Sequence, residues 1–189
     1  KAGADEVPAA TQLFTPHWIV RYLVENSLGR LWMLNHPASR LVDQMDYYIP
    51  SVEAGANFLK IDKPEELKFV DPACGSGHML TYAFDLLYLI YEEIGYAPAD
   101  IPGVILANNL FGIEIDARAG ALAAFALTMK ARARQRTFFA KKVEPQICVL
   151  ESIHFTSLEL DDLLTSSGDR EDEVAFWNQF SEAKLVGSL

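Results

Sequence analysis

The stretch FVDPACGSGHML, residues 69–80, constrains the fold of this chain more than any other segment. It begins with residues that favour a strand, has Gly75 and Gly77 at its centre, and continues as an apolar helix-forming sequence. The two glycines allow the backbone to turn sharply and to approach a ligand closely. The helix that follows offers free N–H groups and the positive end of its dipole to an anionic group. The segment therefore predicts a strand, a ligand-binding turn and a helix.

The residues around this turn restrict the kind of ligand. Position 80 is Leu, so the run is not G-x-G-x-x-G, and the chain has no G-K-[ST] sequence; a dinucleotide or triphosphate is a poor match. Asp71, directly before the turn, would repel a pyrophosphate and attract a cation. A ligand with both a carboxylate and a positive centre fits better. An ordinary strand-to-helix turn would explain G-S-G alone, but it explains the whole D-P-A-C-G-S-G run poorly.

Strands and helices alternate along the chain, which predicts an α/β fold with a parallel sheet and helices on both faces. The expected strands are residues 67–71, 110–116 and 145–152. The expected helices are residues 16–34, 77–95, 100–109, 117–139, 157–167 and 171–186. Three strands are too few for a complete doubly wound sheet, so we expect this chain to be a piece of a longer protein. We divide it into an N-terminal helical segment, residues 1–65, and a partial ligand-binding domain, residues 66–189.

Composition narrows the possible roles. The chain has 189 residues, half of them hydrophobic, which suits one domain with a real core. Its net charge of −10 is unlike that of a free-standing nucleic-acid-binding domain, which is usually basic. Cys74 and Cys148 form no CxxC pair and suggest a reduced, cytoplasmic protein. The longest apolar stretch is interrupted by Asp85, which argues against a membrane span.

Three further positions are candidates for contacts with the same ligand. Glu114, at the end of the second strand, could accept hydrogen bonds from both hydroxyls of a ribose, and Ile115 could pack on an adenine. Glu151, after the third strand, could accept from an exocyclic amine or simply face solvent, and the two readings are about even. Thr15–Pro16 suits an ordinary helix start, or a helix end that closes over the ligand.

The remaining polar residues favour structural roles. The four histidines, His17, His36, His78 and His154, lack metal-ligand spacing, so no metal site is expected. Cys74 has no evident base partner, and its small size beside the ligand is the simpler explanation. A basic cluster occupies the last turns of the 117–139 helix and the residues just after it, and we interpret it as a solvated helix end. Its members are Lys130, Arg132, Arg134, Arg136, Lys141 and Lys142.

Four segments of the chain, taken in order, resemble the S-adenosylmethionine-dependent N6-adenine DNA methyltransferases of the gamma arrangement. That family opens with Q-x-F-T-P, followed by D-P-A-C-G-S-G, G-x-E-I-D and an acid after the third strand. The matching positions are Gln12–Pro16, Asp71–Gly77, Gly112–Asp116 and Glu151. The long spacing between the second and third segments and the ending EAKLVGSL resemble the large methyltransferases of BREX-type phage defence. The resemblance covers residues 12–151.

The resemblance implies a Rossmann-like, three-layer α/β/α methyltransferase fold, here incomplete, with S-adenosylmethionine as cofactor. Thr15 and Pro16 would lie over the methionine end of the cofactor. Glu114 would bind the ribose, Ile115 the adenine ring and Glu151 the adenine amine, where the family usually has Asp. The methionine and sulfonium side would be lined by Asp71, Ala73, Cys74, Gly75 and Gly77.

The catalytic N-P-P-Y or D-P-P-Y motif of the family is absent between Glu151 and Leu189. In the family mechanism the target adenine is flipped out of the duplex, and that motif holds it. We therefore expect this chain to be the cofactor-binding part of a site-specific adenine methyltransferase of restriction-modification or phage defence, without a catalytic residue of its own and inactive alone. Double-stranded DNA would be bound by regions outside the chain, other defence proteins are possible partners, and no membrane is involved. The alternatives are a methyltransferase acting on RNA, protein or a small molecule, and a non-catalytic interaction module.

Overall fold

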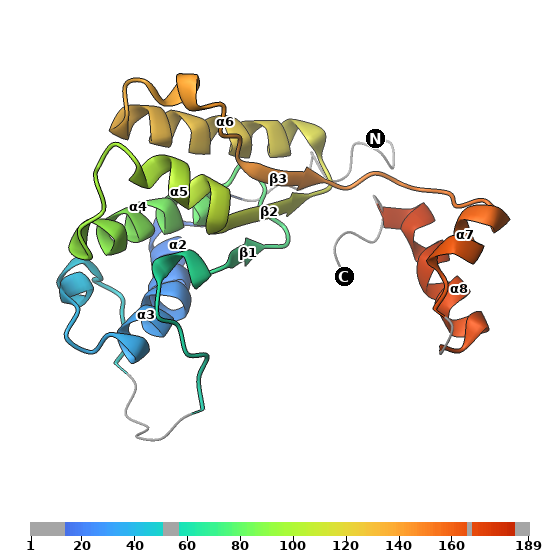
Figure 1. The fold of residues 1–189 in the computed structure, drawn as a ribbon, viewed down its shortest axis with the longest axis horizontal. Helices are drawn as coiled ribbons and strands as arrows, with labels where there is room; N and C mark the ends of the chain where they lie inside the picture. Colours follow the sequence, from blue (N-terminus) through green and yellow to red (C-terminus); the bar gives the residue numbers. More distant parts are fainter. Residues whose placement is uncertain (1–13, 51–56, 166–167, 184–189) are drawn as a thin grey trace.

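A three-stranded parallel sheet forms the centre of the fold (Figure 1). The computed structural model describes residues 14–50, 57–165 and 168–183. The strands, arranged in chain order, are β1 (Phe69–Asp71), β2 (Leu110–Glu114) and β3 (Gln146–Val149). In this register Val70 pairs with Phe111, and Ile113 pairs with Cys148. All three predicted strands are confirmed, and each is shorter than predicted.

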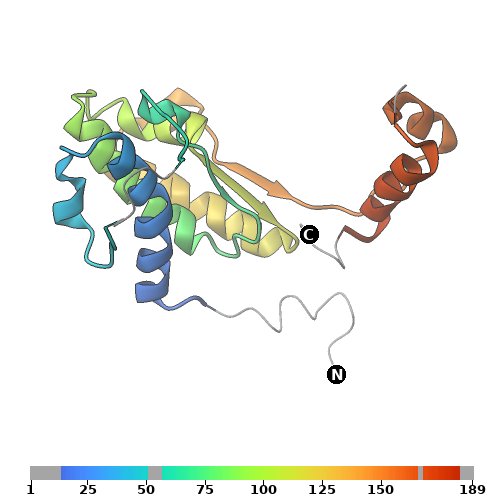
Figure 2. The same cartoon turned by 90° about the horizontal axis from the view of Figure 1, so that it is seen from below.

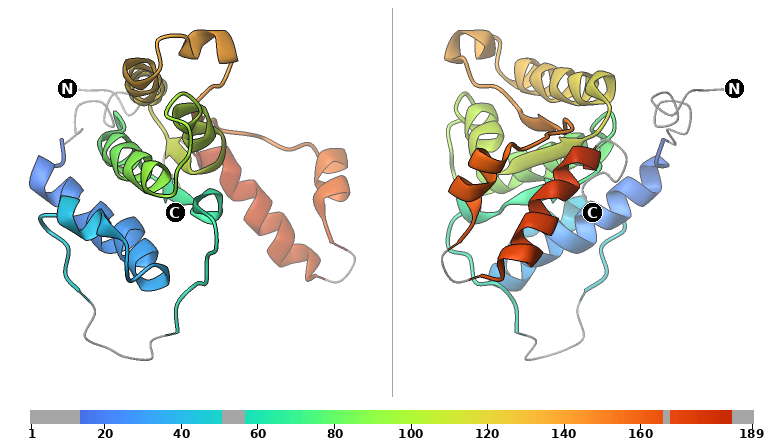
Figure 3. Two further views of the ribbon diagram at one scale, coloured as in Figure 1. Left: turned by 60° about the vertical axis from the view of Figure 1, so that its left-hand side comes forward. Right: turned by 90° about the vertical axis from the view of Figure 1, so that its right-hand side faces the viewer.

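The helices that connect the strands lie on one face of the sheet. Helices α4 (His78–Glu93) and α5 (Ile101–Asn108) connect β1 to β2, and α6 (Ala117–Arg134) connects β2 to β3. The three helices pack against one another (Figure 3). Crossovers between parallel strands are right-handed, so two crossovers that advance in the same direction place their helices on the same face. An α/β fold with a small parallel sheet is therefore confirmed.

The second face of the sheet differs from the prediction of helices on both sides. Val70 and Cys148 are exposed there, and Phe111 and Ile113 are only partly covered. Within the described residues no helix covers this face. The physical reason is the strand order: covering the second face requires the chain to reverse direction across the sheet, and β1 to β3 advance in one direction only.

Small residues bring α6 close to its neighbours. A Cβ added at Gly120 would lie 2.8 Å from Cγ2 of Val149 on β3, so only glycine permits this helix–strand distance. Ala119, Ala123 and Ala131 are buried on the same side of α6. The alanine-rich sequence of α6 therefore favours a helix and also allows close packing on the sheet and on α4.

The N-terminal helix is continuous but contains one wide turn. It consists of α2 (His17–Val24), the π-helical segment η2 (Glu25–Gly29) and α3 (Arg30–Asn35), which confirms the helix predicted over residues 16–34. The buried residues Val20, Val24, Leu28 and Trp32 recur every four positions. In a regular α-helix such a row rotates by about 40° per step, and a π turn, which contains more residues, reduces that rotation. The wide turn thus keeps the row facing the core.

Two asparagines on this helix hold the segment that follows it. Asn26 donates to the carbonyl of Tyr47 at 2.8 Å and accepts from the amide of Ile49 at 2.8 Å. Asn35 donates to the carbonyl of Leu59 at 3.0 Å and accepts from the amide of Ile61 at 3.2 Å. The 3₁₀ turn η3 (Arg40–Gln44) lies between Asn35 and Tyr47 in the chain. Side-chain amides, rather than regular secondary structure, therefore hold the segments around Tyr47–Ile49 and Leu59–Ile61 against the helix. A second 3₁₀ turn, η4 (Pro64–Glu66), precedes β1.

After β3 the chain runs on as an extended segment to α7 (Ser157–Leu163), α8 (Arg170–Asn178) and the 3₁₀ turn η6 (Gln179–Glu182). These helices lie beyond the end of the sheet (Figures 1 and 2). They pack on a cluster of aromatic rings formed by Phe155, Phe176, Trp177 and Phe180. Both predicted acidic helices are confirmed, with shorter bounds. None of the described helices combines the length and apolar character needed to cross a membrane.

Candidate functional site

The glycine turn joins β1 to α4 in the form that the sequence predicts. Gly75 has φ of 53° and Gly77 has φ of 83°, a left-handed conformation that glycine adopts without strain. The amide of Cys74 donates to the carbonyl of Ile113 on β2 at 2.9 Å, and the amide of Gly77 donates to the carbonyl of Cys74 at 2.8 Å. The turn is therefore fixed to the neighbouring strand, and Gly77 directly precedes the first turn of α4.

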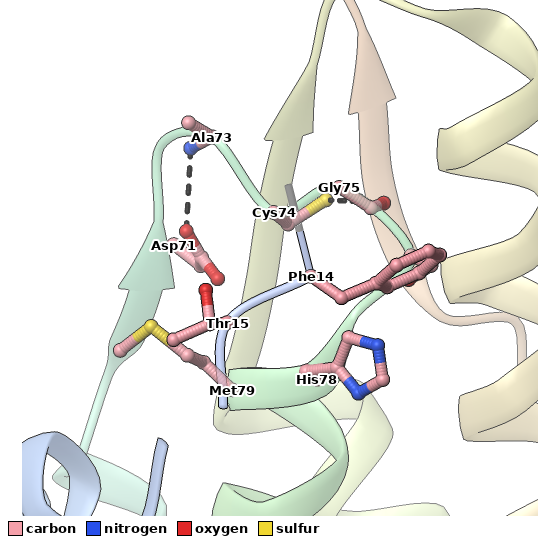
Figure 4. Close-up of a pocket in the computed structure, with 9 residues that line it drawn as sticks. Phe14, Thr15, Asp71, Ala73, Cys74, Gly75, His78 and Met79 are labelled. Carbon is pink, nitrogen blue, oxygen red and sulfur yellow. Dashed lines mark hydrogen bonds between the residues drawn. The ribbon is translucent and has the colours of Figure 1, made fainter. Parts of the chain in front are cut away.

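A small pocket of about 90 Å³ lies at this turn (Figure 4). It is lined by Phe14, Thr15, Asp71, Ala73, Cys74, Gly75, Ser76, His78 and Met79. The ring of Phe14 meets the ring of His78 edge-on, with centroids 5.5 Å apart. The structure thus brings Thr15 beside the turn, although more than fifty residues separate them in the chain. Pro16 caps α2 next to Thr15, and Gly77 lies directly beyond the pocket lining.

Four lining residues were not predicted from the sequence: Phe14, Ser76, His78 and Met79. Ser76, His78 and Met79 follow directly from the helix geometry once the turn is placed, because they occupy its end and the first turn of α4. Phe14 belongs to the Q-x-F-T-P segment, whose residues Gln12 and Leu13 lie outside the described residues. Its position beside Thr15 is the signal that would have included it.

The side chain of Glu114 binds the backbone of the turn. One carboxylate oxygen accepts from the amide of Gly75 at 2.6 Å, and the other accepts from the amides of Ile115 at 2.9 Å and Asp116 at 3.0 Å. Glu114 is buried, and Ile115 is partly buried. Glu114 therefore holds the end of β2 against the glycine turn, a structural role that the sequence did not indicate. A ligand that engaged this carboxylate would have to share or replace the bond to Gly75.

Asp71 is a buried acid at the base of the pocket. It is 8% exposed, and one carboxylate oxygen accepts from the amide of Ala73 at 3.3 Å. Burial raises the pKa of this carboxyl above its ordinary value, the hydrogen bond from Ala73 opposes the rise, and the negative charge of Glu114 adds to it. Among the described residues that line the pocket, none is Lys or Arg. The pocket therefore favours a positively charged group near Asp71.

The thiol of Cys74 is unsuited to act as a nucleophile. Burial raises its pKa to about 12, and the charges of Asp71 and Glu114 contribute to the same shift. A thiol with this pKa stays protonated at neutral pH, and the thiolate is the reactive form. Cys74 lines the pocket, and its predicted role as a small residue beside a ligand stays a prediction.

Glu151 is exposed in the loop after β3 and does not line the pocket. Its predicted contact with an adenine amine stays a prediction. The basic residues at the end of α6 and after it are less free than the sequence suggested. Lys130 pairs with Asp85, Lys141 pairs with Asp100 at 2.9 Å, and Arg134 lies 4.3 Å from the ring centroid of Tyr88. In the described part of the chain, no three His, Cys, Asp or Glu side chains come together as a metal site.

Comparison with known proteins assigns the chain to a family. The model of the MmeI DNA-methyltransferase domain matches residues 56–153, which is more than half of the 189 residues and includes the glycine turn and Glu114. The chain belongs to the MmeI DNA-methyltransferase domain family. Its segment Phe14–Pro16 lies outside the matched range, so the convergence of that segment with the turn is information that the structure adds.

Curated relatives of this methyltransferase domain are much longer proteins. The chain is 49% identical over 156 residues to adenine-specific methyltransferase BrxX of Escherichia coli O9:H4 (strain HS), covering 78% of the chain and 13% of the relative. It is 38% identical over 206 residues to adenine-specific methyltransferase PglX of Lacticaseibacillus casei (strain Zhang), covering 98% of the chain and 17% of the relative. A third relative, 27% identical over 124 residues, is the putative type II restriction enzyme and methyltransferase RM.MjaORFECS2P of Methanocaldococcus jannaschii. The alignment with it covers 54% of the chain and 10% of the relative.

Proposed function

We propose that the pocket at the glycine turn binds S-adenosylmethionine, and that the protein transfers the methyl group to N6 of adenine in DNA. The observation that carries the proposal is the meeting of Thr15 with the buried Asp71 at a glycine turn, in a chain of a DNA-methyltransferase family. The relatives BrxX and PglX are both named adenine-specific methyltransferases. Restriction-modification or phage defence is the setting that we infer, with DNA bound by other regions.

The chemistry of the pocket fits the methionine end of this cofactor. Asp71 would face the ammonium and sulfonium charges, and the backbone amides at the start of α4 would face the carboxylate. The volume of about 90 Å³ is below the roughly 300 Å³ at which whole-ligand pockets begin, so this pocket suits one end of the cofactor and not all of it. Glu114, Ile115 and Glu151 would then serve the ribose and adenine end, with Pro16 and Gly77 shaping the two rims.

The residues of this chain would bind and orient the donor, while the bound cofactor supplies the methyl group. The positive charge on sulfur makes the methyl group reactive, and Asp71 would stabilise that charge without taking part in the transfer. The N-P-P-Y or D-P-P-Y motif that handles the target base in the gamma arrangement does not occur in residues 151–189. We therefore propose that residues outside these 189 hold the flipped adenine, and that this chain alone is inactive.

We also propose that the complete protein has a Rossmann-like, three-layer fold. The outer edge of β1 is unpaired in the described residues, since β1 hydrogen-bonds only to β2. An apolar groove of about 480 Å³ runs beside that edge and is lined by residues of α2, α3 and β1, including Leu23, Leu31 and Val70. A further strand at β1 and helices on the open face would bury these residues.

Methyl transfer by the full-length protein tests the proposed activity. We expect it to transfer labelled methyl groups from S-adenosylmethionine to unmethylated double-stranded DNA, and nucleoside mass spectrometry to find the product as N6-methyldeoxyadenosine. Parallel reactions with RNA and with total protein serve as controls. Label on RNA or protein, or on cytosine alone, would contradict the assignment of the substrate.

Cofactor affinity tests the assignment of the site. We expect Asp71→Asn to weaken binding of S-adenosylmethionine by the full-length protein by about tenfold or more, because one charged contact contributes about 1.5 kcal/mol or more. Glu114→Gln should weaken cofactor binding to a similar extent. The glutamine side chain has an NH₂ group in place of one carboxylate oxygen, so a donor would face a backbone N–H that the carboxylate now accepts from. Asp116→Asn is the matched control: Asp116 accepts from the amide of Arg118 at the start of α6 and does not line the pocket. Calorimetry showing equal affinities in all three variants would disprove the site.

The affinity for S-adenosylmethionine should fall as the pH is lowered. Because the pKa of Asp71 is raised, the carboxylate takes up a proton at a higher pH than an ordinary aspartate, and affinity should begin to fall above the usual value of 3.8. Protonation itself favours the fold, since a group whose pKa is raised on folding contributes stability at low pH that is lost as pH rises. Affinity that falls with acidification while the fold persists would distinguish this effect from acid unfolding. Asp71→Asn should remove this part of the pH dependence.

A further inference from the structure

The two walls of the pocket come from distant parts of the chain. One wall is Phe14–Thr15, which leads directly into α2, and the other is the glycine turn, which leads directly into α4. The width of the pocket therefore depends on how α2 packs against α4. Val20 and Val24 of α2 are buried. Apolar contacts are non-directional, so they do not by themselves fix the position of one helix along another.

A buried polar cluster joins the same two helices. The hydroxyl of Tyr82 on α4 donates to Glu25 at 2.6 Å, and Nε of Arg21 on α2 donates to both groups at 3.2 Å. The amide of Tyr47 donates to the second oxygen of Glu25 at 2.6 Å, and Arg21 also pairs with Asp46 at 2.7 Å. Glu25 is fully buried at the start of the π turn. A buried carboxylate is tolerated only with such partners, so the cluster fixes a single arrangement of the two helices.

Tyr82 lies directly behind the pocket. Thr15 and His78 line the pocket and also line a second cavity of about 250 Å³ to which Tyr82 contributes. The ring of Tyr82 meets the ring of His17 edge-on, with centroids 6.3 Å apart, one helical turn beyond the contact between Phe14 and His78. Burial and the hydrogen bond to Glu25 raise the pKa of Tyr82 to about 12, so its hydroxyl remains a donor at neutral pH.

We propose that Tyr82 is a positioning residue for cofactor binding. Through Glu25 and Arg21 its hydroxyl fixes α2 on α4, and this holds Phe14–Thr15 over the glycine turn. Tyr82 itself does not line the pocket, so it acts through the segment that it positions. The inference rests on the proposed function, because it assigns Tyr82 a part in binding S-adenosylmethionine at that pocket.

The test compares two tyrosines of the same helix in the full-length protein, the partly buried Tyr82 and the buried Tyr91. Tyr82→Phe keeps the ring and removes the hydroxyl that binds Glu25. Tyr91→Phe is the matched control, since the hydroxyl of Tyr91 donates to Asn109 at 2.9 Å, at the other end of α4 and away from α2. Two measurements are made on each variant: affinity for S-adenosylmethionine by calorimetry, and hydrogen exchange at the amides of Ile19 and Val20, which donate to the carbonyl of Pro16 at 2.9 and 3.1 Å.

We expect Tyr82→Phe to weaken binding by about fivefold to tenfold, the effect of one lost hydrogen bond, and to speed exchange at the start of α2. Tyr91→Phe should lower thermal stability by a similar amount but change neither measurement. Unchanged exchange in Tyr82→Phe, or equal changes in both variants, would overturn the inference. If the unsubstituted protein binds and Asp71→Asn weakens binding while Tyr82→Phe does not, the inference fails and the proposed function stands. If the unsubstituted protein does not bind the cofactor, the proposed function fails, and the exchange data alone decide whether Tyr82 positions α2.

Discussion

Replacing Asn109 with leucine should destabilise this domain severely although the two side chains have similar size. Asn109 is fully buried, its amide donates to the carbonyls of Pro64 at 2.7 Å and Leu67 at 2.8 Å, and its oxygen accepts from the hydroxyl of Tyr91. Leucine would leave two carbonyls and one hydroxyl buried without these partners. Each such group costs about 1–3 kcal/mol, so three of them cost at least about 3 kcal/mol, and we expect a loss at the upper end of single-substitution effects, about 3–5 kcal/mol. Urea unfolding followed by circular dichroism measures it.

Two further variants make this result specific. Asn108→Ala is the positional control, because the Asn108 side chain bonds only within its own helix, to the carbonyl of Val104 at 2.9 Å, and we expect a loss of no more than about 1 kcal/mol. Tyr91→Phe should cost stability in the parent protein but little in the Asn109→Leu background, where its partner is already gone. Additive losses in the double variant would show that the two side chains do not act as one unit.

The asparagine pair also shows what sequence patterns miss. The helix predicted over residues 100–109 ends at this asparagine pair, and α5 does end there. The pattern does not reveal that the partly buried Asn108 bonds within α5 whereas the fully buried Asn109 connects the end of α5 to α4 and to the segment before β1. That difference depends on which side of the helix the tertiary packing buries, which the local sequence does not encode.

The strands and most helices were predictable because their signals are local. Glycine turns, prolines and apolar runs bound β1, β2 and β3, and the 3.6-residue repeat marks α2 and α4. The π turn at Glu25–Gly29 was not predicted, because it keeps a row of residues facing the core, and that row is defined by tertiary packing. The uncovered face of the sheet was also not predicted, since alternation of strands and helices indicates a parallel sheet but not the order of its strands.

Part of the pocket lining was predictable from the sequence, and the contacts of those residues were less so. Thr15 and Asp71 meet as expected because each lies at the end of a well-defined element. The sequence predicted that Glu114 binds a ligand, whereas in the structure its carboxylate also accepts hydrogen bonds from three backbone amides. Glu25 was overlooked entirely; its signal was an acid on the apolar side of a helix, four residues after an arginine, and its meaning depends on Tyr82 from a distant helix.

Alanine at Gly77 should damage both the fold and the site, and alanine at Gly75 should damage mainly the site. Both glycines have positive φ, so each substitution carries a conformational cost of about 1 kcal/mol. A Cβ at Gly77 would also lie 3.0 Å from Cβ and 3.1 Å from Cα of Ala123, so α4 would have to move away from α6. A Cβ at Gly75 meets nothing within 4 Å. We therefore expect Gly77→Ala to lose about 3 kcal/mol in total, as in other overpacked sites, and Gly75→Ala about 1 kcal/mol.

The affinity for S-adenosylmethionine should also distinguish Gly75→Ala from Gly77→Ala. Gly75 lines the pocket, so its new methyl group would occupy space that the cofactor needs, and affinity should fall by tenfold or more although stability changes little. In Gly77→Ala the loss of affinity would instead follow the shift of α4. The variant Gly77→Ala with Ala123→Gly should recover part of the lost stability and binding, because the second change removes the Cβ that the first one meets. The cost of positive φ at position 77 and the contact with Cα of Ala123 would remain. Thermal unfolding and calorimetry on the four proteins decide this. Failure of Ala123→Gly to restore any part of either property would show that the contact with Cβ of Ala123 is not what reserves position 77 for glycine.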